Sequence, residues 1–361
     1  FLLSMIGTGL APNIWVFVIA RFIGGIAVGG ASVIVPMYIS EVSPPDKRGR
    51  LVATNQFSIV LGILVAFFSN YIINSFGEGN WRWMFLAGVV PSGIFFFLLF
   101  FIIRSPRWLV KVGRIDEARS AIKKVNPGVN IEEMIKSIKE SLEEETLGRT
   151  ISLLRKPYFR LVIIGIGIGM FNQLSGINII NYYSSDIFRT AGFSAESSMY
   201  QSVLIGVTNL FFTIVGMSLI DKFGRKFLLY IGAIGMPVTL GLFSIAYITG
   251  HTNGYLLLVY LLCFIAFFAV SQGTVIWVML SEMFPTMVRA RGSALGSFSH
   301  WFFNFFNALL FPITVANFGV GYVFLFFFAC TLLSIFFYKY ALIETRGKTL
   351  EEIEKLVLSH K

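Results

Sequence analysis

The chain has 361 residues, of which 56% are hydrophobic and only 13% are charged. This composition is too apolar for a soluble domain. The formal net charge is +10 at pH 7, but the basic residues lie beside apolar stretches, which favours a membrane topology over nucleic-acid binding. Both cysteines, Cys263 and Cys330, lie within apolar stretches, so the sequence predicts neither a disulfide framework nor a metal site.

Most of the chain consists of apolar stretches long enough to cross a bilayer, which takes about 20 residues per helix. After a short stretch at 1–10 they cover, in chain order, 14–38, 51–71, 83–103, 161–185, 199–220, 227–250, 252–280 and 292–338. The last stretch holds two crossings, separated by the turn in "ANFGVGY". We therefore predict an all-α membrane protein with nine full spans and a partial one.

The basic residues alternate along the chain in a way that predicts its orientation. Of the 29 Lys and Arg residues, 26 lie in the five segments 41–50, 104–160, 222–226, 285–291 and 339–361. The positive-inside rule makes these segments cytoplasmic. We expect a multi-pass protein of the plasma membrane, taken as a bacterial inner membrane, with the central linker and the C-terminus in the cytoplasm.

Two distant segments repeat one pattern of acidic, proline and basic residues. "SEVSPPDKRGR" covers 40–50 and "SEMFPTMVRAR" covers 281–291, a shift of 241 residues. Such a repeat predicts two similar helical bundles in the same orientation, each of six spans in known transporters of this plan. The first two spans and part of the third are then expected to precede Phe1.

This repeat also divides the chain into four expected regions. They are the remainder of the first bundle with spans 3–6 (1–104), an amphipathic helical linker (105–158), the second bundle with spans 7–12 (159–342) and a C-terminal tail helix (343–361).

Seven motifs stand in the order found in one transporter family. They are "RFIGGIAVGG", "SEVSPPDKRGR", "SPRWL", "NQLSGINIINYY", "DKFGRK", "GTVIW" with "SEMFPTMVRAR", and "ETRGKTLEEIE". Over its whole length the chain resembles the sugar porters of the major facilitator superfamily, which include glucose transporters and bacterial xylose–proton symporters. The resemblance implies the major facilitator fold and transport of a monosaccharide by alternating access. The chain departs from the family pattern at Ile103, Arg104, Asn172, Thr274 and Ile343.

Carboxamide side chains lie in otherwise apolar spans. They both donate and accept hydrogen bonds, as sugar hydroxyls do, and they cost less than charges at membrane depth. These amides are Gln56, Asn172, Gln173, Asn178, Asn209 and Asn304. Gly176 is expected to break the seventh span, so that Gln173 and Asn178 turn toward one ligand. Trp277 and Trp301 are expected to pack on the sugar or to form gates.

His300, Asn304 and Asn307 recur at i, i+4 and i+7 and therefore share one helical face. For His300 three roles stay open, namely ligand contact, proton-linked group and packing residue. Asn307 is expected to hydrogen-bond between helices. The positions that the resemblance implies as sugar contacts are Gln56, Gln173, Asn178, Asn209, Trp277 and Asn304, with Asn172 in place of a glutamine and Ile59 as an apolar contact.

Charged residues at the cytoplasmic ends of the spans are expected to hold the inner side of the two bundles shut. This charge network comprises Glu41, Arg48, Asp221, Arg225, Glu282 and Arg289. One exposed pair contributes only about 0–1 kcal/mol, but several pairs together bias an equilibrium between two conformations.

Arg21 lies inside a span, where a guanidinium needs a partner, and no Asp or Glu lies in the middle of any span. The resemblance implies that proton-coupled relatives carry an acid in their first span, whereas uniporters lack it. Sugar–proton symport is favoured, and a uniporter or a non-transporting sensor stays open. An enzyme is not expected, because no nucleophile or paired acids face inward. The expected partners are a monosaccharide, H⁺ and the lipid bilayer, with no cofactor, no nucleic acid and a monomeric state.

Overall fold

The computed structural model describes residues 1–361 except 44–47, 78–79, 127, 149–151, 155–157, 252, 286, 343 and 345–361. All regular elements in this described part of the chain are helices. Two compact units divide the chain, Phe1–Glu143 and Glu144–Lys361. Nine helical segments of the described residues are long and apolar enough to cross a membrane, as the sequence predicted.

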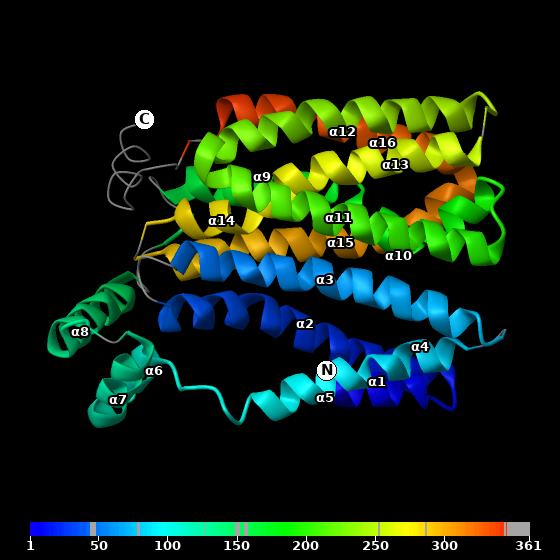
Figure 1. Ribbon diagram of the computed structural model, residues 1–361. Helices are drawn as coiled ribbons and strands as arrows, with labels where there is room; N and C mark the ends of the chain where they lie inside the picture. The colour runs from blue at the N-terminus through cyan, green and yellow to red at the C-terminus, as the bar shows by residue number, and fades with distance from the viewer. Residues whose placement is uncertain are drawn as a thin grey trace. The chain divides into compact units, whose positions relative to one another are not determined.

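The first unit begins with apolar helices, of which α2 and α3 are long, and ends with the helices of the central linker (Figure 1). Its helices are α1 (Leu2–Gly9), α2 (Ile14–Val42), α3 (Arg48–Asn74), α4 (Trp81–Ala87), α5 (Val89–Leu98), α6 (Pro106–Lys111), α7 (Ile115–Val125) and α8 (Ile131–Gly148). The stretch expected as one span at 83–103 is divided between α4 and α5 at Gly88, whose N–H bonds to the carbonyl of Phe85.

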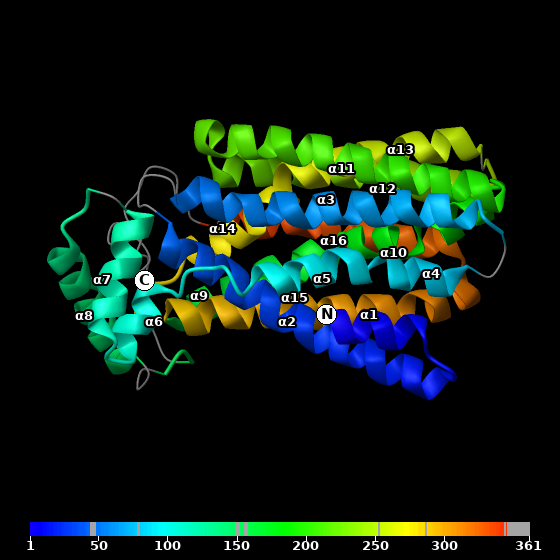
Figure 2. The same cartoon turned by 60° about the horizontal axis from the view of Figure 1, so that its bottom comes forward.

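Helices α6, α7 and α8 gather beyond one end of α2, α3 and α5 (Figure 2). Ile122 and Ala118 of α7 are fully buried against Leu109 of α6 and Ile135 of α8. The apolar residues of α7 and α8 recur at helical spacing, so each helix offers one face to this small core. The helices that the sequence predicted in the linker therefore form a packed cluster with a hydrophobic centre.

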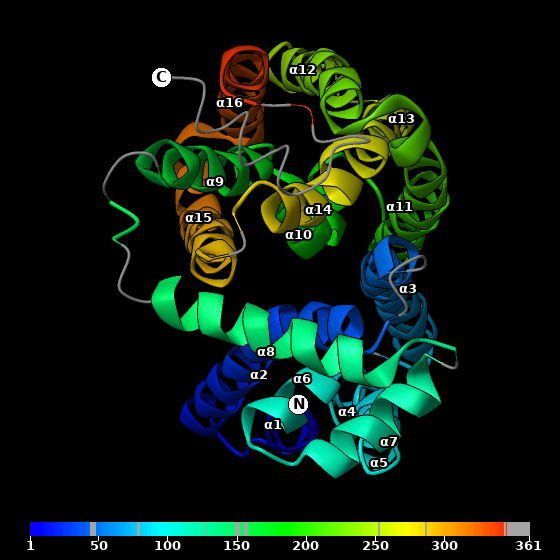
Figure 3. The ribbon, with the colours of Figure 1, turned by 90° about the vertical axis from the view of Figure 1, so that its left-hand side faces the viewer.

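The second unit is built from long helices and one π-helical turn. They are α9 (Tyr158–Gln173), α10 (Ile177–Thr190), α11 (Ala195–Phe223), α12 (Arg225–Ile248), α13 (Gly254–Phe268), η1 (Ala269–Gly273), α14 (Thr274–Glu282), α15 (Arg289–Phe318) and α16 (Val320–Tyr340). Figure 3 shows these helices nearly end-on, with α12 beside α16 and α15 beside α9.

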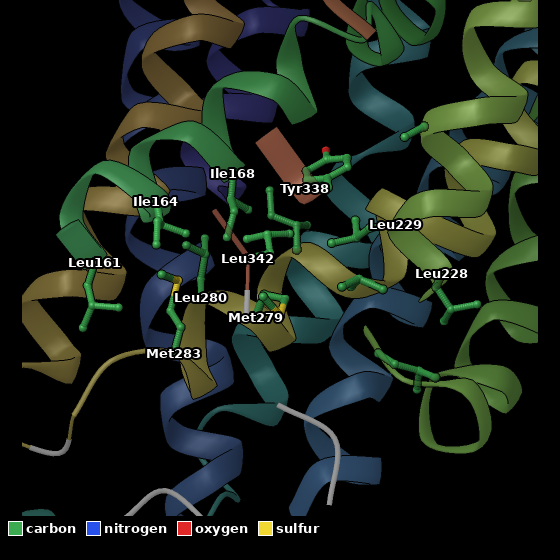
Figure 4. Close-up of a cluster of buried hydrophobic side chains, with 14 of the residues drawn as sticks. Leu161, Ile164, Ile168, Leu228, Leu229, Met279, Leu280, Met283, Tyr338 and Leu342 are labelled. Carbon is green, nitrogen blue, oxygen red and sulfur yellow. The ribbon is translucent and has the colours of Figure 1, made fainter. Parts of the chain in front are cut away.

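The core of the second unit lies between α9, α11, α12, α14 and α16 (Figure 4). Leu228, Val275 and Phe284 are almost completely buried in it. A bilayer supplies little hydrophobic drive between helices, so such a core is held mainly by close van der Waals packing. This packing fixes α9 and α14, which carry polar side chains toward the site described below.

Two interruptions shape the second unit. The seventh span breaks between α9 and α10, where Gly176 adopts a left-handed conformation with φ of +84°. This confirms the break predicted from the sequence, because glycine takes this conformation without a Cβ clash. The tenth span contains the π-helical turn η1, where Thr274 Oγ1 donates to the carbonyl of Ala269 at 2.7 Å. That turn was not predicted.

Candidate functional site

The break between α9 and α10 brings three carboxamides together. Asn178 Nδ2 donates to Gln173 Oε1 at 2.9 Å, and Gln173 Nε2 donates to Asn172 Oδ1 at 3.0 Å. Asn172 and Gln173 are buried at the end of α9, and Asn178 stands on the first turn of α10. The helix break thus places consecutive amides in contact, as the sequence predicted for Gln173 and Asn178.

The helix α15 packs against α9 and presents its polar face to this break. His300 Nε2 lies 2.6 Å from Gln173 Nε2. Asn304 Nδ2 donates to the hydroxyl of Tyr182 at 3.1 Å, and Asn307 Nδ2 donates to the backbone carbonyl of Gln173 at 2.7 Å. The i, i+4, i+7 row predicted for α15 therefore meets both halves of the broken span.

Two tryptophans enclose the ring of His300. The ring centroids of Trp277 and His300 are 5.1 Å apart, and those of His300 and Trp301 are 5.3 Å apart with nearly perpendicular planes. Trp277 comes from α14 and Trp301 from α15. This arrangement joins amides and aromatic faces, the two kinds of surface that a sugar ring needs.

Several polar atoms of this cluster have no hydrogen-bond partner among the described residues. They are Asn172 Nδ2, His300 Nδ1, Trp301 Nε1 and Asn304 Oδ1. Buried polar groups in proteins are almost always paired, and an unpaired one costs about 1–3 kcal/mol. Four such atoms around one pair of helices indicate a site built for a polar, uncharged ligand.

The remaining predicted contact residues lie elsewhere. Asn209 is buried in α11, and no hydrogen bond in the described part of the structure joins it to the amide cluster. Gln56 and Ile59 lie on α3 of the first unit, where Gln56 Oε1 is another buried atom without a described partner and Ile59 is exposed. Tyr182, which bonds Asn304, was not predicted from the sequence.

Part of the predicted charge network forms an ion pair within the second unit. Arg225 Nη2 lies 3.0 Å from Glu282 Oε1. The carboxylate of Glu344 accepts hydrogen bonds from the backbone N–H groups of Arg225 and Lys226 at 3.1 and 2.9 Å. An acid at the N-terminus of α12 satisfies free N–H groups and complements the helix dipole. Sequence reasoning missed Glu344, although "ETRGKTL" is one of the quoted motifs.

In the first unit Glu41 has partners that the sequence did not predict. Its Oε2 accepts a short hydrogen bond from the hydroxyl of Ser105, and its Oε1 lies 4.0 Å from Arg107 Nε. Ser105 and Arg107 belong to the quoted "SPRWL" motif, which could have suggested them.

Of the three remaining residues of the predicted network, one has a described contact with the backbone. Arg289 Nε donates to the backbone carbonyl of Phe284 at 3.1 Å. The side chains of Arg48 and Asp221 lie outside those described. Pairing across the two bundles therefore stays a prediction.

Arg21 lies on α2 with its guanidinium carbon 5.3 Å from the ring centroid of Phe85. A cation over an aromatic face is a weak attraction at an exposed position.

Comparison with known proteins gives the family. The family model for the sugar (and other) transporters matches residues 1–357. The chain belongs to this family. The resemblance found from the motifs is therefore confirmed, and the family is one of transporters.

Curated relatives of this transporter include two proton symporters. The arabinose-proton symporter of Bacillus subtilis is 35% identical over 362 residues, which is 99% of this chain and 78% of the relative. The D-xylose-proton symporter of Escherichia coli K12 is 37% identical and covers 96% of this chain and 72% of its own length. The major myo-inositol transporter of B. subtilis is 36% identical over 98% of this chain and 77% of its own length.

Solved structures confirm the fold of this transporter. The proton:xylose symporter XylE, bound to 6-bromo-6-deoxy-D-glucose, superposes with a TM-score of 0.83 at 34% identity, covering 98% of this chain and 80% of the other. The inward-open conformation of XylE from E. coli gives a TM-score of 0.82 at 32% identity, with 98% and 80% of the two chains covered. The protein is a multi-pass membrane transporter with the major facilitator fold, as the sequence predicted.

Proposed function

We propose that the protein carries a monosaccharide across the membrane together with a proton, by alternating access. The observation that supports this most strongly is the cluster of Asn172, Gln173, Asn178 and His300 at the break of the seventh span. Its amide side chains are uncharged and can both donate and accept hydrogen bonds, which suits a ligand rich in hydroxyl groups. Proton symporters for arabinose and xylose among the relatives support the same substrate class.

The contact residues are part of the proposal. Gln173, Asn178, Trp277 and Asn304 would bind the sugar from the second bundle, with Asn172, His300 and Trp301 beside them, and Asn209 from α11. Gln56 and Ile59 would contribute from the first bundle. Substrate sites in transporters of this plan lie near the bilayer midplane.

Proton coupling is proposed from the relatives and from Arg21. Among the described residues its recorded contact is with Phe85, and an aromatic ring does not neutralise a guanidinium. We propose an acidic group as the proton carrier beside Arg21. The alternative is a uniporter, in which the same arginine serves without a proton carrier.

Placement and assembly are proposed as follows. The protein lies in the bacterial inner membrane as a monomer, with the linker (105–158) and the C-terminal tail (343–361) in the cytoplasm. The regions 1–104 and 159–342 are the two bundles. Single cysteines are placed in the linker, and intact cells are treated with a membrane-impermeant thiol reagent. The proposed orientation predicts that these cysteines stay unlabelled, because the reagent does not reach the cytoplasm.

Transport is tested with purified protein in liposomes. Uptake of radiolabelled D-xylose, L-arabinose and D-glucose is measured with and without an inward proton gradient. Symport predicts accumulation above the outside concentration only when the gradient is present. A uniporter equilibrates the sugar at the same final level in both cases, and absence of uptake of all three sugars contradicts the assignment to these monosaccharides.

A further inference from the structure

We propose that the start of α12 and the end of α16 bind one anionic phospholipid, with its phosphate on lysine ammonium groups and its acyl chain on exposed aromatic rings. This surface, the α12–α16 edge, lies outside the amide cluster of α9, α10 and α15. Its members are basic or aromatic, and each stands within about one helical turn of the end of a candidate span. They are Lys222, Phe223, Lys226, Phe227, Phe336, Lys339 and Tyr340.

Helices α12 and α16 lie side by side (Figure 3). Near one end of the pair, Ser244 Oγ donates to the carbonyl of Gly321 at 2.8 Å. At the other end, Lys226 Nζ donates to the carbonyls of Lys339 and Leu342 at 3.2 and 2.9 Å. The start of α12 therefore meets the end of α16, so the helices are antiparallel and both reach the same membrane boundary at this edge.

Aromatic side chains flank the seam between the two helices at this boundary. In an antiparallel pair of right-handed helices, the residue that follows a contact residue turns to the same side of the pair on both helices. Phe227 follows Lys226 and Tyr340 follows Lys339, so both rings stand on one side. Phe227 is 48% exposed and stacks on Phe223, with ring centroids 5.4 Å apart and an angle of 25° between the planes. Tyr340 is 70% exposed.

Three ammonium groups lie around these rings. Lys222 is exposed, and Lys226 Nζ gives two of its three hydrogens to the carbonyls at the end of α16. Lys339 is exposed, with its Nζ 5.3 Å from the ring centroid of Tyr340. The described carboxylate beside them is Glu344, which accepts hydrogen bonds from two backbone N–H groups at the start of α12. Among the described side chains the edge therefore has an excess of positive charge.

A phospholipid complements both kinds of group at this edge. Basic pockets between membrane helices bind anionic headgroups, and ammonium groups form short, charge-assisted hydrogen bonds with phosphate oxygens. The rings of Phe223, Phe227 and Phe336 are exposed and offer apolar surface to an acyl chain. A free phosphate would engage the lysines alone and leave this apolar surface uncovered. The combination of charge and apolar area therefore favours a lipid over a dissolved anion.

The experiment compares two lipids that differ in charge. The purified protein in neutral detergent is mixed with equal amounts of phosphatidylglycerol and phosphatidylcholine of the same acyl chains, and native mass spectrometry counts the bound lipid. We expect phosphatidylglycerol to be preferred, and Lys222→Gln with Lys339→Gln to weaken its binding about tenfold. The control is Lys123→Gln with Lys124→Gln, since these exposed lysines lie on α7. Equal binding of both lipids, or equal losses in the two double variants, overturns the proposal.

Thermal unfolding separates a lipid site from a free-anion site. Both lysines of the first double variant are exposed, so without lipid it should unfold at the temperature of the unchanged protein. Phosphatidylglycerol should raise the unfolding temperature of the unchanged protein, whereas the same concentration of inorganic phosphate should not. An equal rise with phosphate overturns the proposal.

A pair of aromatic variants tests the apolar half of the edge. Phe223→Ala with Phe227→Ala should reduce the rise in unfolding temperature that phosphatidylglycerol produces. The matched control is Phe298→Ala with Phe302→Ala, because these two rings are also exposed and lie 5.9 Å apart on α15. We expect the control to keep the full rise. An unchanged rise in Phe223→Ala with Phe227→Ala, or an equal reduction in the control, overturns the proposal.

Discussion

Asn307 Nδ2 donates a hydrogen bond of 2.7 Å to the backbone carbonyl of Gln173, the last residue of α9. A break in a membrane helix frees backbone carbonyls, which must find partners because lipid offers none. The carbonyl of Gln173 accepts from the N–H of Gly176 at 3.0 Å, and the side chain of Asn307 supplies a second donor from α15. This side chain therefore anchors the residue that also makes the central contacts of the amide cluster.

Removing this anchor should destabilise the protein and misplace Gln173. In Asn307→Leu the carbonyl keeps only the N–H of Gly176 as a partner, and we expect the free energy of unfolding to fall by about 0.5–1.5 kcal/mol for the lost hydrogen bond. Thermal unfolding in detergent measures the loss. The matched control is Asn317→Leu on the same helix, since Asn317 is exposed and its described hydrogen bond is to the carbonyl of Ile313 in its own helix. Equal losses in both variants would contradict the role of Asn307.

Replacing Gly176 by alanine should lower the free energy of unfolding by more than the strain of the left-handed conformation alone. That conformation costs a non-glycine residue about 1–2 kcal/mol. A Cβ at Gly176 would also lie 2.7 Å from Cδ2 of Phe327, and overpacking adds about 1–3 kcal/mol. Gly319→Ala is the control, because Gly319 has a similar φ of +81° and open space around it. Thermal unfolding should rank Gly176→Ala as the less stable variant, and a reversed order would refute the packing argument.

The ion pair between Arg225 and Glu282 should contribute modestly to stability. Both side chains are partly buried, with 13% and 27% exposed, so screening by water is incomplete. A double-mutant cycle with Arg225→Gln and Glu282→Gln should give a coupling energy of about 1 kcal/mol in unfolding. A coupling energy near zero would show that the contact is without energetic effect.

A second double-mutant cycle tests the predicted charge pairing across the bundles. We expect Glu41→Gln and Arg289→Gln, singly and together, to shift the balance between inward-open and outward-open forms. Alkylation rates of single cysteines at the two mouths measure that balance. If neither variant changes these rates or uptake, the charge network does not act as a latch.

Helices α7 and α8 should lose one stabilising contact in acid. Arg119 Nε donates to Glu132 Oε1 at 2.7 Å, and this hydrogen bond lowers the pKa of the Glu132 carboxyl below its ordinary value of 4.5. A lowered pKa in the folded state adds stability above that ordinary value, and the added stability is lost as pH falls through the folded pKa. The protection of α7 and α8 against hydrogen exchange, taken relative to the intrinsic exchange rate at each pH, should therefore fall below about pH 4.5, and less so in Glu132→Gln. Identical acid profiles would contradict this.

Much of the fold could be predicted because its causes are local. The nine spans follow from apolar length, and the break at Gly176 follows from the freedom of glycine beside Ser175. The meeting of Gln173 and Asn178 follows from that break. The face shared by His300, Asn304 and Asn307 follows from helical spacing alone.

The contacts that were not predicted depend on which helices pack together, and the spacing of residues along the sequence does not encode this. Glu41 meets Ser105 and Arg107, which lie more than sixty positions away in the chain. Glu344 caps α12 only because α16 packs beside that helix. The π-helical turn at Ala269–Gly273 interrupts the regular helix, and no sequence period reveals it.

Sugar binding to a Gln173 variant tests the central claim most directly. Calorimetric binding of D-xylose, L-arabinose and D-glucose is compared between the unchanged protein, Gln173→Leu and the control Asn317→Leu. The account predicts that at least one sugar binds the unchanged protein and Asn317→Leu alike, and that Gln173→Leu, still folded, binds it at least about tenfold more weakly. Undiminished binding by folded Gln173→Leu would contradict the claim that the amide cluster holds the sugar.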